Sequence, residues 1–224
     1  MLFNSLNREL NYYGLWLGFL GVLRLQDDHA CFAAYGYNIK TRVTTGIILQ
    51  TSADEVKAIQ DKLIHYKRFL GQELLLRSVI TEISLDHCAE LLIGAKQAVI
   101  DIEDATGEHT WAEYTATSKE TRTDSELSKD AHGVKIEIAL IRRRIEVISY
   151  WGDQLLEKCA EMVDTTSSAP ATIGNREEML QWIKNMKSRV KMVVLDTEYL
   201  ETRATNQVGA VSIFKIFAPY LPTT

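Results

Sequence analysis

Two heptad patterns in the second half of the chain constrain its fold more than any other feature. Apolar residues recur there in alternating steps of four and three, the spacing of helices that pack along one face. The first seam consists of Leu127, Ala131, Val134, Ile138, Ile141, Ile145, Ile148, Gly152, Leu155, Cys159 and Met162. The second consists of Met179, Ile183, Met186, Val190, Val193, Thr197, Leu200, Ala204, Gln207, Val211 and Phe214.

A short polar connection separates the two seams. Residues 164–174 contain Thr, Ser, Pro and Gly and are typical of a loop, after which Asn175 and Glu178 have the spacing of a helix cap. Helices joined by so short a loop pack as antiparallel neighbours. We expect the helix-packing side chains to be Val134, Ile138, Ile141, Ile145, Ile148, Leu155, Met179, Ile183, Met186, Val190, Val193 and Leu200.

Three seam positions are not apolar side chains. Thr197 and Gln207 weaken the packing of the second seam but can fix its register. Gly152 lies on the first seam, where a missing side chain permits close approach of a neighbour. We therefore expect a pair of helices held in one alignment.

The first 50 residues have the character of strands. The apolar stretch Tyr12–Leu23 is too short to span a bilayer, which takes about 20 residues, and predicts a buried strand or a core helix. Alternation from His29 to Val43 predicts a strand. Thr44, Thr45 and Gly46 are expected to turn the chain before the apolar run of residues 47–49. A small β element, such as a hairpin, follows from this pattern.

Helical periodicity begins near residue 51. Ser52 and Glu55 have capping-box spacing, Gly71 predicts a break or kink, and Thr106-Gly107 predicts a helix end. The expected apolar face between these points contains Leu76, Val79, Ile83, Leu91, Ala95, Ala98, Ile102 and Ala105.

The sequence thus predicts a mainly α fold with a small N-terminal β element and two long antiparallel heptad-patterned helices in the C-terminal half. We expect a β-containing segment at residues 1–50, a helical segment at 51–107, a polar loop at 108–124, a long helical hairpin at 125–216 and a tail at 217–224.

Composition and motifs argue against several classes of function. A formal net charge of -5 is unlike the basic excess of a general nucleic-acid binder. The sequence contains no GxxxxGK[ST], GxGxxG, GxSxG or HExxH motif, so we do not expect an enzyme. The cysteines Cys31, Cys88 and Cys159 form no CxxC pair and suggest a reduced intracellular compartment. Cys88 and the adjacent His87 are expected to be ordinary helix residues.

Two charged runs remain as candidate sites. Oxygen ligands suit hard divalent cations, so Asp101, Glu103, Asp104 and Glu108 are weak candidates for a Mg²⁺ site, although a solvated acidic face is the favoured interpretation. Arg142, Arg143 and Arg144 fall between seam positions and should point away from the core, as a surface salt-bridge face that includes Glu146.

Two segments resemble a known family. Tyr199–Val211 is similar to the end of the stalk helix in divergent fungal CorA-like magnesium transporters, with Arg203, Gln207 and Val208 at the matching R-x-x-x-Q-hydrophobic positions. The segment Leu74–Ile83 resembles an "LLLP…E" stretch of these proteins, with Arg77 where proline is common. The likeness spans residues 30–212, and the order of elements also fits.

This resemblance implies a cytosolic domain that takes part in assembly and in divalent-cation sensing. Family members carry two transmembrane helices and a Gly-Met-Asn tripeptide after the stalk, and this sequence contains neither. The resemblance therefore implies a domain with no pore of its own, located in the cytoplasm or on the cytosolic face of a membrane. A membrane would be a partner only through a further C-terminal region.

A second interpretation comes from a different class of protein. The same long helices suit a helical interaction scaffold or signalling bundle with no role in transport. Both interpretations predict self-association or binding of a partner helix, and neither predicts nucleic-acid binding.

Overall fold

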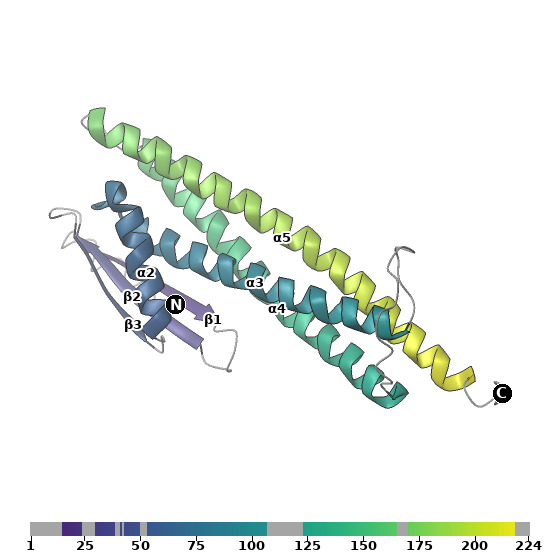
Figure 1. Ribbon diagram of the computed structural model, residues 1–224. Coiled ribbons are helices and arrows are strands. Elements are labelled where there is room, and N and C mark those ends of the chain that lie inside the picture. The colour runs from purple at the N-terminus through teal and green to yellow at the C-terminus, as the bar shows by residue number, and fades with distance from the viewer. Residues whose placement is uncertain are drawn as a thin grey trace, which may run out of the picture. The chain divides into compact units, whose positions relative to one another are not determined.

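The computed structural model describes residues 15–23, 30–38, 41, 43–49, 53–106, 123–164 and 170–217. The predicted fold class is confirmed, because a small antiparallel sheet precedes helices that pack against one another (Figure 1). The elements, in chain order, are β1 (Leu15–Leu23), β2 (Ala30–Asn38), β3 (Val43–Leu49), α2 (Ala53–His65), the 3-10 helix η1 (Lys67–Phe69), α3 (Leu75–Thr106), α4 (Asp124–Asp164) and α5 (Pro170–Phe217).

The chain divides into two compact units, and each long helix contributes to both. Unit 1 contains the residues up to His87 and residues 147–189, which include the sheet, α2, η1 and parts of α3, α4 and α5. Unit 2 contains residues 88–146 and the residues from Val190 onwards. Both units are therefore assembled from segments that are distant in sequence.

The sheet of unit 1 has three strands in the order β1-β2-β3, all antiparallel. Tyr12–Leu23, predicted as a strand or a core helix, supplies β1. The turn predicted at residues 44–46 is wrong, because Thr44 and Thr45 lie within β3 and pair with Tyr37 and Gly36. The chain instead reverses after Asn38, whose side-chain oxygen accepts a hydrogen bond from the Thr41 backbone amide at 3.1 Å. Asparagine commonly initiates turns in this way.

The helical segment after the sheet breaks where the glycine predicted it. Gly71 has a φ of 84°, a conformation that glycine adopts without steric cost. The Tyr37 hydroxyl donates a hydrogen bond to the Gly71 carbonyl oxygen at 2.8 Å, which connects β2 to this turn. The predicted cap at Ser52 lies outside the described residues.

The expected apolar face of α3 is only partly correct. Val79, Ala95 and Ile102 are buried, but Ala105 is exposed and Ile83 is only partly covered. Residues 78–82 are all buried, so the helix has no single apolar stripe there that a periodicity argument could identify. In unit 2 the buried residues of α3 are regularly spaced, in alternating steps of four and three. They are Cys88, Leu92, Ala95, Val99 and Ile102.

The first seam is confirmed from Leu127 to Cys159, since every position of it in that range is buried on α4. Met162 lies outside the residues whose side chains are described.

A capping box that we did not predict begins α4. Thr123 donates its backbone amide and hydroxyl to Glu126 Oε2, at 2.9 and 2.8 Å. The T-x-x-E spacing of Thr123 and Glu126 is the sequence signature of a capping box.

The second seam, on α5, is confirmed with one correction. Its positions from Met179 to Val211 are buried except Val193, which is only half-buried. The side chain of Phe214 lies outside the described residues. The predicted loop is too long, because α5 already begins at Pro170, a residue well suited to a first helical turn. Asn175 is therefore inside the helix and is not its cap; its side chain donates a hydrogen bond to the Arg68 carbonyl oxygen at 3.2 Å.

The residue that approaches Gly152 is a lysine side chain. A Cβ added there would lie 3.5 Å from Lys187 Cδ, an ordinary van der Waals contact, so the expected close backbone approach is not required. Among the described helices, none is both long enough and apolar enough to cross a membrane.

Replacing Gly133 with alanine should stabilise the protein. Gly133 is exposed in the middle of α4, and a Cβ added there would have no atom within 4 Å, so Gly133→Ala should raise the free energy of unfolding by about 1 kcal/mol. Urea unfolding followed by circular dichroism measures the change. Gly71→Ala is the matched control and should destabilise, because its φ is positive. A destabilised Gly133→Ala variant would contradict the helix described at that residue.

Candidate functional site

The four acidic residues suggested as cation ligands do not form one site in the described part of the chain. Asp101 is exposed and accepts a hydrogen bond from Gln97 at 2.9 Å. Glu103 is buried and paired with an arginine, and Asp104 is exposed. Glu108 lies outside the described residues. Among the residues that are described, no group of three or more His, Cys, Asp or Glu side chains could hold a metal ion.

Two residues of the segment Tyr199–Val211 instead belong to a largely buried polar cluster in unit 2, which we call the Arg203 cluster: Glu103, Thr106, Arg203 and Gln207. Arg203 binds Glu103 with two nitrogens, Nε to Oε1 at 3.0 Å and Nη2 to Oε2. The Thr106 hydroxyl lies 3.0 Å from Gln207 Oε1. Because Glu103 pairs with Arg203 and Thr106 with Gln207, α3 and α5 run parallel in this unit.

The ion pair of the Arg203 cluster is largely buried. The side chains of Arg203 and Glu103 are only 14% and 4% exposed. The hydrogen bonds from Arg203 to Glu103 raise the pKa of the guanidinium despite its partial burial. A bidentate contact of this kind fixes both distance and orientation. The cluster therefore holds α5 to the last turns of α3.

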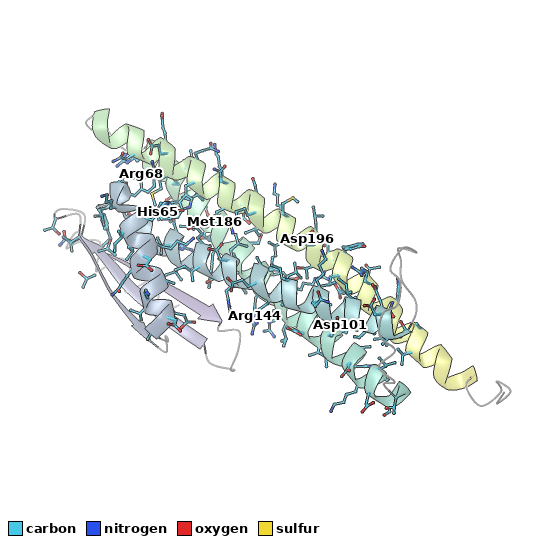
Figure 2. All side chains as sticks on the ribbon, in the orientation of Figure 1. His65, Arg68, Asp101, Arg144, Met186 and Asp196 are labelled. Atoms are coloured by element: carbon cyan, nitrogen blue, oxygen red, sulfur yellow. The ribbon has the colours of Figure 1, made fainter. Side chains whose placement is uncertain are left out.

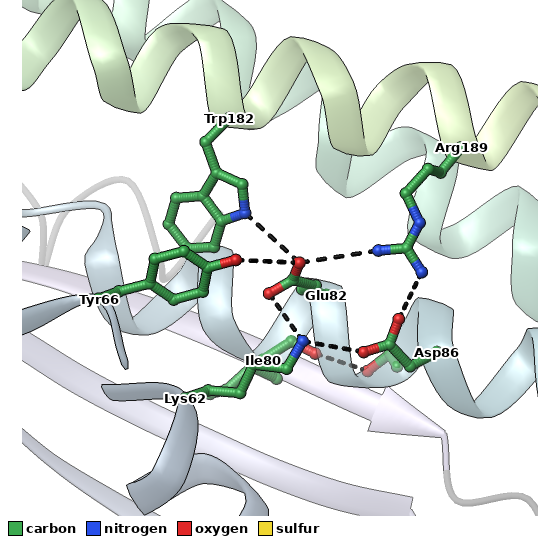
Figure 3. Close-up of polar contacts among 8 residues, drawn as sticks. Lys62, Tyr66, Ile80, Glu82, Asp86, Trp182 and Arg189 are labelled. Atoms are coloured by element: carbon green, nitrogen blue, oxygen red, sulfur yellow. Dashed lines mark hydrogen bonds and ion pairs between the residues drawn. The ribbon is translucent and has the colours of Figure 1, made fainter. Parts of the chain in front are cut away.

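A second polar cluster lies in unit 1 and connects α2, α3 and α5 (Figure 3). We call it the Glu82 network; its members are Lys62, Tyr66, Glu82, Asp86, Trp182 and Arg189. Glu82 is buried, and its Oε1 accepts hydrogen bonds from the Tyr66 hydroxyl at 3.2 Å and from Trp182 Nε1 at 3.5 Å. Its Oε2 lies 3.0 Å from Lys62 Nζ, as an ion pair without a directed hydrogen bond.

The Glu82 network balances two positive against two negative groups. Asp86 accepts from Lys62 at 2.9 Å and from Arg189 at 2.5 Å, and Arg189 also lies 3.6 Å from Glu82. Burial by itself would raise the pKa of Asp86, but hydrogen bonds from Arg189 and Lys62 outweigh burial and lower it. Burial would likewise lower the pKa of Lys62, and Asp86 and Glu82 reverse that effect and raise it.

Aromatic rings cover one side of this network. The rings of Tyr66 and Trp182 stack with centroids 4.0 Å apart, and Phe69 lies almost parallel to Trp182 at 5.9 Å. Burial, followed by the charge of Glu82, raises the pKa of the Tyr66 hydroxyl. Tyr66 therefore acts as a neutral hydrogen-bond donor, and the network is built to join helices.

Cys88 and Cys159, the cysteines whose side chains the structure describes, are buried core residues. Cys88 is 1% exposed, and burial raises its pKa to about 11, so the thiol is protonated at neutral pH. Burial also raises the pKa of Cys159. Since the thiolate is the reactive form, neither environment favours nucleophilic chemistry. The prediction that Cys88 is an ordinary helix residue agrees with this placement.

In the arginine run, Arg142 and Arg143 are exposed, as predicted, whereas Arg144 is partly covered. Arg142 Nε is 3.6 Å from Glu146, and its Nη1 donates to Glu201 on α5 at 2.7 Å. The sequence indicated the first contact, because i and i+4 residues share a helix face. It did not indicate the second contact, which joins residues 59 positions apart, nor the contacts of Glu82 with Trp182 and of Glu103 with Arg203, each 100 positions apart, because these pairs depend on how the helices align.

Breaking the Arg203 cluster should strongly destabilise the protein. Glu103→Ala leaves the mostly buried Arg203 without its carboxylate, and loss of one partner of a buried pair costs about 3–5 kcal/mol. Urea unfolding measures the loss. The double variant Glu103→Leu/Arg203→Met should recover most of it, because no unpaired charge remains. Equal losses in the single and double variants would show that the loss does not come from an unpaired buried charge.

The Glu82 network should make stability depend on pH at both extremes. The lowered pKa of Asp86 gives stability that is present above its unfolded pKa, about 3.9, and is lost as pH falls through the folded value. The raised pKa of Lys62 gives stability that is present below its unfolded pKa, about 10.4, and is lost as pH rises through the folded value.

Melting temperatures of the wild type and Asp86→Asn measure the acidic part of this effect. The difference between them should be largest near pH 7 and should shrink below pH 4, where the Asp86 carboxylate becomes protonated. Asp61→Asn, an exposed position on α2, is the matched control. A difference that stays constant with pH would contradict the network.

No protein-family model matches this chain, and none of the curated proteins does.

Proposed function

We propose that this chain is an assembly domain of the CorA-like type, located in the cytoplasm or on the cytosolic face of a membrane, that responds to divalent cations. The observation that supports the proposal is the set of contacts made by the two polar residues of the R-x-x-x-Q pattern. Both of its polar residues, Arg203 and Gln207, are directed into the protein, where they bind Glu103 and Thr106 of α3. The pattern that suggested the family is thus part of the packing of α5.

The order of elements supports the same proposal. A β-containing segment is followed by helices and then by two long helices, the arrangement that the resemblance implies for the cytosolic part. Each long helix carries one buried heptad face, and exposed apolar side chains remain on other faces, among them Ile136 on α4 and Leu195 on α5. Exposed apolar side chains on a rigid helix are suited to assembly.

A cation response would come from acidic residues on the surface. Asp101 and Asp104 are exposed one turn apart on α3, so two copies that meet along this face of α3 would bring four such carboxylates together. Carboxylate oxygens are the ligands that Mg²⁺ prefers, and it usually keeps several waters. We therefore propose that Mg²⁺ acts between copies of the chain.

Light scattering coupled to size exclusion, with and without Mg²⁺, tests the proposal. We expect a mass above that of one chain that increases when Mg²⁺ is added, because the cation would offset repulsion between acidic faces. Asp101→Asn/Asp104→Asn should abolish the Mg²⁺ effect, and Asp61→Asn should leave it unchanged. A monomer under both conditions would overturn the proposal.

The second candidate function is a helical interaction scaffold without a transport role. The exposed apolar residues favour it equally, since a different protein could bind them. Self-association that Mg²⁺ does not affect would favour this second function.

A further inference from the structure

Helix α2 is held to the rest of unit 1 by much less buried surface than the long helices are. None of its 13 residues is buried, whereas α3, α4 and α5 each carry a buried face. Its apolar residues Val56 and Ile64 are 40% and 67% exposed. An isolated helix shorter than about 12–15 residues is only marginally stable in water. The helical state of α2 therefore depends on its contacts with the rest of unit 1.

The short helix η1, which follows α2, is anchored to α5. Phe69 is completely buried, and its ring lies almost parallel to that of Trp182. Arg68, labelled in Figure 2, lies 3.1 Å from Glu178, and its carbonyl oxygen accepts the hydrogen bond from Asn175. The chain at the end of α2 is thus fixed by contacts to which α2 itself does not contribute.

Lys62 connects α2 to α3 through two ionic contacts, which we call the Lys62 latch. Its Nζ lies 3.0 Å from Glu82 Oε2 and 2.9 Å from Asp86 Oδ2, between the two carboxylates (Figure 3). The side chains of Lys62 and Asp86 are 29% and 35% exposed, so water and salt reach this part of the network. Charge pairs that are open to solvent weaken as the ionic strength rises.

The remaining contacts of the Glu82 network do not need α2. Without Lys62, Glu82 still accepts hydrogen bonds from Tyr66 and Trp182, and Asp86 still accepts from Arg189. Tyr66 itself is held by its stacking on Trp182. Neither carboxylate would therefore be left without a hydrogen-bond donor if α2 moved away, and the cost of moving α2 is limited to its own contacts.

We infer that α2 is a separately opening element of unit 1, which leaves α3 and unfolds while η1, α3 and α5 stay assembled, and which the Lys62 latch holds closed. Regions with few buried apolar contacts are the ones that open below the free energy of global unfolding. Because the latch is ionic and partly exposed, salt would regulate this opening. The inference concerns one element of the fold and does not depend on the proposed function.

Hydrogen exchange of the full chain, followed by mass spectrometry, tests this inference. In the wild type, amides of residues 53–65 should exchange at least roughly tenfold faster than those of residues 75–87. Lys62→Met should accelerate the exchange of residues 53–65 by roughly another tenfold, since it removes charge-assisted contacts, and should leave residues 75–87 unchanged. Lys57→Met, which removes an exposed charge from the same helix, is the matched control and should change neither segment.

The ionic strength provides the second measurement. Raising NaCl from about 0.1 M to about 1 M shortens the screening length to about 3 Å, close to the distances within the latch. The exchange of residues 53–65 should therefore accelerate with salt in the wild type and in Lys57→Met. In Lys62→Met it should be insensitive to salt, because the latch is absent.

Each contrary outcome overturns a stated part of the inference. Exchange of α2 as slow as that of α3 would overturn separate opening, and so would a Lys62→Met variant in which both segments accelerate equally. Equal exchange in Lys62→Met and Lys57→Met would overturn the role of the latch. A wild type whose α2 exchange salt does not change would overturn regulation by salt.

Discussion

Burial of the heptad faces is the constraint on which the remaining structure depends. Ile138, Ile141, Ile145 and Leu155 on α4 are almost completely inaccessible to water, as is Ile183 on α5. Each such side chain contributes about 1.5–3 kcal/mol when it leaves water. Long helices gain most of their stability from packing of this kind, because intrinsic propensity contributes little. This packing brings the helices together, and the polar clusters then select one alignment of them.

The polar clusters determine alignment more than they add stability. Arg203 and Glu103 lose most of their hydration, and their mutual attraction must first offset that cost. What such a pair provides is directional contact, since a bidentate arginine tolerates only one arrangement of its carboxylate. Glu82 has the corresponding role in unit 1, where it accepts hydrogen bonds from Tyr66 and Trp182 and forms an ion pair with Lys62. In each unit α3 is thereby held parallel to α5.

The distribution of apolar side chains connects the fold to the proposed function. A helix that packs only within its own chain needs one apolar face. Helix α5 carries exposed apolar side chains in addition to its buried face, among them Met192, Leu195 and Tyr199. The proposed assembly role would use exposed side chains of this kind.

The sequence by itself determined the helices and their buried faces, because a heptad spacing acts locally and every position of the first seam from Leu127 to Cys159 is buried. It failed where local patterns were ambiguous, as at the turn after Asn38 and at the start of α3, where polar and apolar residues are buried alike. Only the tertiary structure decided what the charged residues do. Glu103 was one of four similar acidic residues in sequence, and it became a buried partner of Arg203 because helix alignment brings together residues 100 positions apart. The pairing of charges depends on distance in space, which no local spacing encodes.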